Sequence, residues 1–158
     1  MTLKVQGRSA RLTHFPNAHT DGDTYVWFSD ANVLATGDIV TMERYPNIDF
    51  ANGGNIRGMI AGVDTYLKLV NDKTKIVPGH GSLTDKARLV EYRKMLVAAR
   101  DRVARLIKQG MSEDEVVAMR PMSDYDAKMK IDDTAKVNFI RVVYNSLKPP
   151  AVKAAAAN

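Results

Sequence analysis

Residues 14–23 read His14-Phe15-Pro16-Asn17-Ala18-His19-Thr20-Asp21-Gly22-Asp23, and after an apolar run residues 35–38 read Ala35-Thr36-Gly37-Asp38. A third piece follows downstream as Ile76-Val77-Pro78-Gly79-His80-Gly81. His19, Asp38 and His80 each come after a strand-like run and lie near glycine, which predicts that a sheet displays all three on loops at one edge. Two imidazoles and a carboxylate that meet there would suit a borderline cation such as zinc.

The composition is typical of one globular domain. The chain has 158 residues, of which 45% are hydrophobic, and this is enough for a core. It has no cysteine, which excludes disulfides and thiolate metal sites. The first residues carry no apolar segment typical of a secretory signal, and no apolar stretch approaches the roughly 20 residues of a membrane span. We expect no membrane contact. These features do not identify the cellular compartment, and the cytoplasm is the default expectation.

The net charge of +5 concentrates between residues 86 and 108, which also have a helical pattern. A basic segment of this kind can bind nucleic acid or form a solvated helix face. No nucleic-acid motif and no interleaving of basic and aromatic residues accompanies it, which favours the solvated face. We therefore expect no nucleic-acid partner.

The first half of the chain predicts antiparallel strands followed by an α/β unit. Short runs on either side of Gly7 predict a hairpin, and residues 24–36 predict two more antiparallel strands joined by a turn. Residues 39–52 lack a clear period and predict a long loop over the edge of the sheet. Apolar residues at helical spacing predict a helix over residues 55–70, and residues 75–77 predict a short strand.

The second half predicts helices. A long helix is expected over residues 85–109, with Thr84 as its N-cap and Gly110 after its end. Its core-facing stripe is predicted to comprise Leu89, Tyr92, Leu96, Ala99, Val103 and Leu106. Ser112 and Glu115 fit a capping box that opens a short helix. Apolar residues between positions 137 and 147 suggest a final helix, and residues 149–158 are expected to be a flexible tail.

The motifs His19-Thr20-Asp21-Gly22-Asp23, Thr36-Gly37-Asp38 and Pro78-Gly79-His80-Gly81, in this order and spacing, resemble the second half of a metallo-β-lactamase-fold hydrolase. The resemblance implies an α/β fold: the second half of an αββα sandwich, with antiparallel strands followed by helices and extra C-terminal helices. It implies that His19 binds a first metal ion, that Asp38 bridges two ions and is catalytic, and that His80 binds the second. In the family two zinc ions and a bound hydroxide attack ester, thioester, lactone, β-lactam or phosphoester bonds.

The family's preceding motif, His-x-His-x-Asp-His, is missing, because only thirteen residues come before His14. The chain therefore resembles a C-terminal half, with residues 1–83 as a half-sandwich that carries the motifs and residues 84–148 as a helical part of the same domain. We expect weak or partial zinc binding, little hydrolysis by this chain alone, and either an N-terminal half or a second copy as partner. The alternative is a non-catalytic relic or interaction module that pairs through its exposed sheet.

Several further residues lie near the motifs or are aromatic. Asp21 and Asp23 are candidates for carboxylates that orient the metal-binding imidazoles, or they are turn residues around Gly22. His14 is a weaker candidate for the same site, and local packing or hydrogen bonding is the favoured interpretation. Tyr45, Trp27 and Phe50 are expected to pack in the core or at the edge of the sheet rather than to bind substrate.

Overall fold

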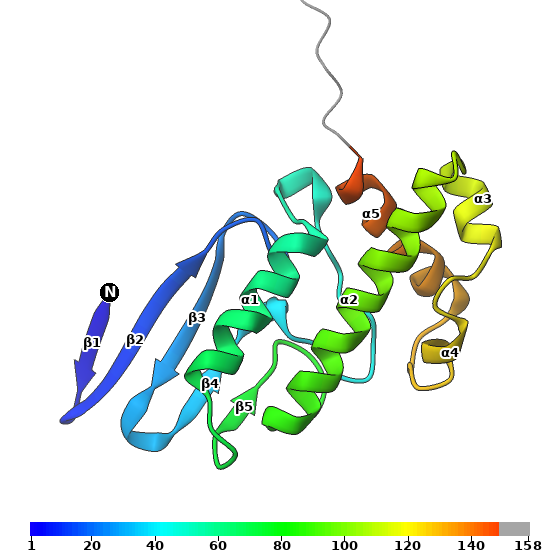
Figure 1. Cartoon of the computed structure of the whole chain (residues 1–158). Helices are drawn as coiled ribbons and strands as arrows, with labels where there is room; N and C mark the ends of the chain where they lie inside the picture. Colours follow the sequence, from blue (N-terminus) through cyan, green and yellow to red (C-terminus); the bar gives the residue numbers. More distant parts are fainter. Residues whose placement is uncertain (149–158) are drawn as a thin grey trace, which may run out of the picture.

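A computed structural model describes residues 1–148 of the chain, so the predicted tail at residues 149–158 lies outside the described residues. The fold is built on one five-stranded sheet with the strand order β1-β2-β3-β4-β5 (Figure 1). The strands are β1 Thr2–Val5, β2 Arg8–Phe15, β3 Asp23–Phe28, β4 Val33–Ala35 and β5 Lys75–Val77. The first four strands pair antiparallel in sequence order, and β5 pairs parallel to β4.

The predicted hairpin is confirmed. Val5 pairs with Arg8, so the connection between β1 and β2 is a two-residue loop of Gln6 and Gly7. Both loop residues have positive φ angles, 50° and 77°, which is the backbone of a type I′ turn and matches the right-handed twist of the strands.

Within residues 1–148, five α-helices follow or interrupt the sheet: α1 Ile56–Leu69, α2 Lys86–Lys108, α3 Glu113–Ala118, α4 Ser123–Asp126 and α5 Asp133–Leu147. Helix α1 joins β4 to β5 after a long connection and packs against α2 (Figure 1). Helix α2 packs in turn against α5, so the helices extend outward from one side of the sheet. None of the helices in residues 1–148 is long and apolar enough to cross a lipid bilayer.

The helix ends confirm two predicted caps and correct a third. Ser112 and Glu115 form a capping box at the start of α3, and Gly110 follows α2 with a φ angle of 83°. Thr84, however, does not cap α2, because its N–H and C=O groups both pair with Ile76. Asp85 is the N-cap instead, and its carboxylate accepts a hydrogen bond from the Arg88 N–H at 2.9 Å.

The core lies between the sheet and the helices. All six residues of the predicted α2 stripe are buried, which confirms it. From the sheet, Tyr25, Leu34 and Ile76 point to the same side, and the Tyr25 ring meets the Tyr66 ring of α1 edge to face at 5.1 Å.

Residues 39–52 form the predicted long connection at the edge of the sheet, with little regular structure. Most of their apolar side chains are buried. Tyr45 is buried and Trp27 packs against the core, as predicted. Phe50 is 51% exposed, so the prediction that it packs was wrong.

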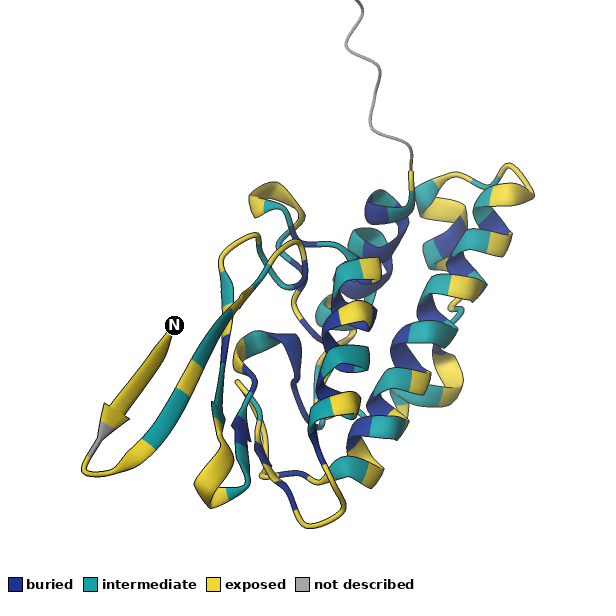
Figure 2. Ribbon diagram, turned by 60° about the vertical axis from the view of Figure 1, so that its left-hand side comes forward, coloured by how far each residue is buried: buried dark blue, intermediate teal, exposed yellow. Residues whose placement is uncertain are grey.

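The sheet face opposite α1 carries many apolar side chains beside the polar His14, Thr24 and Lys75, and no helix covers it within residues 1–148 (Figure 2). Cross-strand pairing and strand alternation place on this face Leu12, Val26, Phe28, Val33, Ala35 and Val77. Phe28 and Val77 are 36% and 38% exposed, whereas Leu34 and Ile76 on the other face are fully buried.

Candidate metal centre

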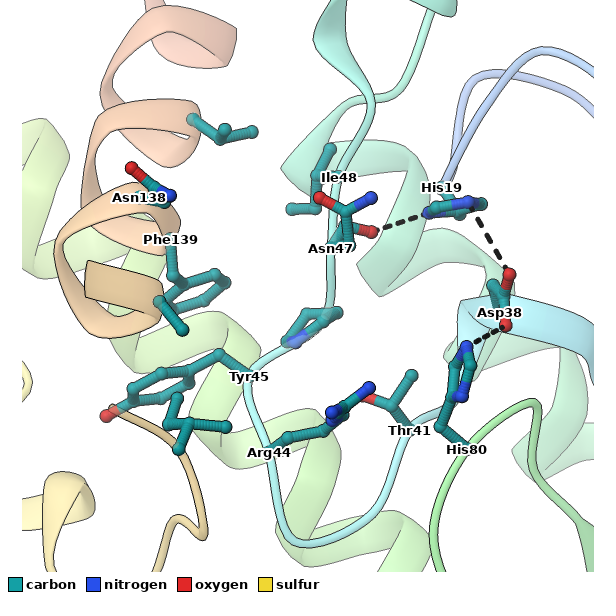
Figure 3. Close-up of a pocket in the computed structure, with 14 residues that line it drawn as sticks. His19, Asp38, Thr41, Arg44, Tyr45, Asn47, Ile48, His80, Asn138 and Phe139 are labelled. Carbon is teal, nitrogen blue, oxygen red and sulfur yellow. Dashed lines mark hydrogen bonds and ion pairs between the residues drawn. The ribbon is translucent and has the colours of Figure 1, made fainter. Parts of the chain in front are cut away.

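The side chains of His19, Asp38 and His80 lie together at one edge of the sheet (Figure 3). His19 is in the loop after β2, Asp38 is in a 3₁₀ turn after β4, and His80 is in the loop after β5. The carboxyl ends of the parallel strands β4 and β5 meet at this edge, which explains why residues 38 and 80 are neighbours. The expectation that the three residues share one edge is confirmed.

The two imidazoles face opposite oxygen atoms of the same carboxylate. His19 Nε2 is 3.6 Å from Asp38 Oδ2, and His80 Nε2 is 3.4 Å from Asp38 Oδ1. Both distances exceed the usual 2.7–3.2 Å of an N–H···O hydrogen bond. Two ligands of one tetrahedral zinc ion, each bonded at about 2.1 Å, lie about 3.4 Å apart. Each histidine therefore forms, with one oxygen of Asp38, a pair with the spacing of two ligands on one ion.

Neither pair is a complete site. Residues 1–148 contain no group of three histidine, aspartate or glutamate side chains arranged to hold a single metal ion. The reason is geometric, because Asp38 lies between the two histidines and presents a different oxygen to each. The described residues thus offer one imidazole nitrogen on each side of a shared carboxylate.

Two buried tyrosines hold the turn that carries Asp38. The Tyr66 hydroxyl of α1 donates to the carbonyl oxygen of Thr36 at 3.2 Å, and the Tyr92 hydroxyl of α2 donates to that of Ile39 at 3.2 Å. Burial raises the pKa of both hydroxyls well above the ordinary tyrosine value, so both stay protonated donors. The turn is therefore fixed on both sides of Asp38 by the helices behind it.

Gly79 allows the His80 loop to approach Asp38. Its N–H donates to the carbonyl oxygens of Gly37 and Val40, both at 3.0 Å. A Cβ atom at this position would clash with Asp38 Oδ1 and with the backbone of Gly37. A residue without a side chain is thus required for the backbone to pass this close to the carboxylate.

The ring of His19 is oriented by a backbone group that sequence reasoning missed. His19 Nδ1 lies 2.6 Å from the carbonyl oxygen of Asn47. A carbonyl can only accept, so Nδ1 carries the proton and the Nε2 lone pair points toward Asp38. The His19 loop is braced separately, because Asp23 Oδ2 accepts from the N–H groups of His19 at 2.7 Å and Thr20 at 3.0 Å.

The three residues predicted to orient the imidazoles have other roles. Asp23 binds backbone N–H groups, as just described, rather than a ring nitrogen. Asp21 accepts from the Asn17 side chain at 3.3 Å, and His14 Nε2 lies 2.6 Å from the Asp21 carbonyl oxygen. All three therefore organise the loop around His19, and the turn-forming interpretation of Asp21 and Asp23 is the better one.

A cavity of about 370 Å³ opens beside these residues. It is within the size range of small-molecule sites. Its wall includes Arg44, Asn47 and Ile48 from the long connection and Ala135, Asn138, Phe139 and Val142 from α5. Sequence reasoning did not assign α5 to the site. Nothing local in the α5 sequence distinguishes a cavity wall from an ordinary amphipathic face.

No protein-family model and no curated protein sequence matches the chain, but solved structures resemble it. The inverting sec-alkylsulfatase Pisa1 from Pseudomonas sp. superposes on 93% of this chain with a TM-score of 0.68 and 15% identity. A metallo-β-lactamase from Pontibacter korlensis covers 61% with a TM-score of 0.52 and 17% identity. A metallo-β-lactamase family protein from Thermus thermophilus covers 67% with a TM-score of 0.56 and 21% identity.

The chain has a metallo-β-lactamase-type α/β fold. It matches 25% of the length of the alkylsulfatase, 45% of the Pontibacter protein and 36% of the Thermus protein. The chain thus spans less than half the length of these metallo-β-lactamase-fold structures and of the alkylsulfatase.

Proposed function

We propose that this chain supplies one part of a binuclear metal site in a metallo-β-lactamase-fold hydrolase. The observation that supports the proposal is the placement of His19 and His80 on opposite oxygens of Asp38, at the spacing of ligand pairs. In this proposal His19 and Asp38 would hold one ion, and His80 and Asp38 would hold the other. The remaining ligands come from residues other than these 158, in the same polypeptide or in a partner.

The donor set fits a borderline divalent cation. Imidazole nitrogen and carboxylate oxygen suit zinc and similar first-row metals, and the Asn47 carbonyl already orients one imidazole as metal-binding histidines require. A metal bound there would lower the pKa of a coordinated water to about 7 and so supply a nucleophile at neutral pH.

The chain's own residues have definable roles in that reaction. Asp38 would be shared by the two ions, and the tyrosines behind its turn fix the backbone on either side of it. The cavity beside them accepts the substrate and brings the scissile bond to the edge where the three residues meet. The substrate panel to test comprises esters, lactones, thioesters, β-lactams and phosphoesters. Sulfate esters join it because Pisa1 is a sec-alkylsulfatase.

Zinc binding to the purified chain tests the proposal directly. Isothermal titration should give weak binding that His19→Ala, Asp38→Ala and His80→Ala each reduce by about 10-fold or more, because each removes one donor. Asp72→Ala is the matched control, because this exposed carboxylate pairs with Lys86 away from the site and its loss should leave zinc affinity unchanged.

Complementation tests the hydrolase part of the proposal. The isolated chain should show negligible turnover, since a reacting group misplaced by about 1 Å already costs about 100-fold in rate. Addition of a segment with the missing His-x-His-x-Asp-His motif should restore tight zinc binding and turnover on the panel. Restored turnover that survives all three alanine substitutions would refute the assignment, as would tight zinc and full activity in the isolated chain.

A second candidate function is that of a non-catalytic module that pairs through its sheet. The specific observation in its favour is the uncovered apolar face around Val26, Phe28 and Val77. Contiguous apolar surface of this kind is uncommon on stable monomers and marks contact sites. The two functions make different predictions for metal, because a pure pairing module should bind no zinc that depends on Asp38.

A further inference from the structure

Arg44 is a cationic side chain at the candidate site, and no ion-pair partner for it lies within residues 1–148. It lines the cavity next to the metal centre, and its guanidinium lies between Tyr45 and His80 in Figure 3. Within residues 1–148 no carboxylate forms an ion pair with Arg44, although its neighbours Arg88 and Lys130 both pair with Glu43. An arginine left free at a cavity wall has five donors available for a ligand.

Glu43, the residue before Arg44, helps to place Arg44 at the cavity wall. Glu43 has a φ angle of 64°, a left-handed conformation that is unfavourable for a residue with a side chain. Its carboxylate accepts a hydrogen bond from Ser82 Oγ at 2.6 Å and lies 3.6 Å from Arg88 Nη2 and 3.9 Å from Lys130 Nζ. These contacts hold the unfavourable backbone in place and direct Glu43 away from the cavity that Arg44 enters.

The backbone around Glu43 is tied down as well. The Lys130 N–H donates to the Glu43 carbonyl oxygen at 2.8 Å, and the Met42 N–H donates to the His80 carbonyl oxygen at 2.9 Å. The segment that carries Arg44 is therefore attached both to the His80 loop and to the segment before α5. The backbone position of Arg44 relative to His80 is thus fixed by these hydrogen bonds rather than left to a free loop.

The opposite wall of the cavity is mostly apolar, with Asn138 as a polar residue in it. Helix α5 contributes Ala135, Phe139 and Val142, and the Phe139 ring stacks on the Tyr45 ring at 4.4 Å with an interplanar angle of 4°. Asp38 is the one carboxylate among the residues that line this cavity, and in the proposed function metal ions neutralise it. The cavity thus combines a cationic side with a hydrocarbon side.

We propose that Arg44 is a specificity-determining residue that binds the oxyanion group of a substrate whose apolar chain lies along α5. Guanidinium binds sulfate, phosphate or carboxylate oxygens through paired N–H donors, which a neutral substrate cannot satisfy. Glu43 acts as a positioning residue for Arg44. The inference rests on the proposed function, because it concerns the same cavity and selects the anionic members of its substrate panel.

An NMR titration of the full 158-residue chain in EDTA tests this without metal or turnover, with Asp38→Asn in every sample to remove the negative charge that metal ions would neutralise. Hexyl sulfate should shift amide signals of residues 41–48 and of α5, with hexanol and methyl sulfate binding at least about 10-fold more weakly. Arg44→Gln should weaken hexyl sulfate binding by about 10-fold or more and leave hexanol unchanged. Arg8→Gln, which removes an exposed arginine of β2, is the matched control and should change nothing.

Hexyl sulfate binding by Glu43 variants tests the positioning role of this residue. Glu43→Ala should weaken hexyl sulfate binding at an unchanged fold, as judged by its NMR spectrum, and Glu43→Gln should restore part of the affinity because it keeps an acceptor for Ser82. Equal hexyl sulfate affinity with and without Arg44→Gln would overturn the inference, as would shifts confined to residues far from the cavity. Loss of zinc binding in the His19 variant is measured separately, so a failure of the metal proposal is distinguishable from a failure of this one.

Discussion

The Nδ1 atom of His19 lies 2.6 Å from the backbone oxygen of Asn47, and this contact decides which nitrogen of the ring faces Asp38. A carbonyl oxygen accepts hydrogen bonds only, so the proton of the neutral ring belongs on Nδ1. The remaining nitrogen, Nε2, then presents its lone pair toward the carboxylate 3.6 Å away. The ring is thus prepared for a cation by a residue 28 positions downstream.

The tautomers of two histidines should therefore differ in the metal-free protein. Long-range ¹H–¹⁵N NMR spectra should show the neutral His19 ring protonated at Nδ1. His14 is an internal control with the opposite expectation, because its Nε2 atom is the one that contacts a carbonyl, that of Asp21 at 2.6 Å. A neutral His19 ring protonated at Nε2 would contradict the prepared orientation.

Removal of the hydroxyls behind Asp38 should weaken metal binding as well as stability. Tyr66→Phe and Tyr92→Phe each leave a backbone carbonyl without its buried donor, which should lower the free energy of unfolding by about 1–3 kcal/mol. Zinc affinity should fall in both, because the Asp38 turn gains freedom. Tyr144→Phe breaks a similar bond to the Met111 carbonyl, away from the cavity lining, and should cost stability alone. Urea denaturation and zinc titration separate the two effects, and equal zinc affinity in all four proteins would count against the bracing role.

A methyl group at position 79 should disturb the centre. Gly79→Ala places a Cβ atom against Asp38 Oδ1 and the Gly37 backbone, so we expect a loss of about 1–3 kcal/mol in the free energy of unfolding and weaker zinc binding. Gly22→Ala is the control, because its nearest contact would be Thr20 Oγ1 at an ordinary 3.8 Å. The close approach of the two loops would be in doubt if both variants unfolded at the same urea concentration as the wild type.

The uncovered sheet face should make the chain associate. Sedimentation velocity at rising protein concentration should show a shift from monomer to larger species, driven by burial of apolar side chains such as Val26. Val26→Lys should keep the chain monomeric, since a charge would have to be buried in the contact. Ala61→Lys adds the same charge on the exposed side of α1 and should associate like the wild type. A wild-type chain that stays monomeric at high concentration would argue against both a second copy and a pairing role for this face.

Local sequence patterns predicted most of the secondary structure, because strands and amphipathic helices each carry their own period. The α2 stripe, the Gln6-Gly7 hairpin and the Ser112 capping box follow from neighbours within a few residues, and the structure contains all three. The start of α2 is a local feature that sequence reasoning misplaced. Thr84 and Asp85 are both good caps, and the choice between them depended on the pairing of Thr84 with Ile76.

Local patterns also predicted that His19, Asp38 and His80 meet at the edge of the sheet, since all three follow strands and lie near glycines. The surroundings of these three residues could not be predicted in this way, because they depend on the tertiary fold. The Asn47 carbonyl on His19, the Arg44 guanidinium in the cavity and the Phe139 wall come from segments without a regular pattern or from a helix far along the chain. A periodic pattern reports which face of an element is apolar, but it does not report which distant element packs there. Those contacts depend on how segments far apart in the sequence pack together, and no local stretch of residues contains that information.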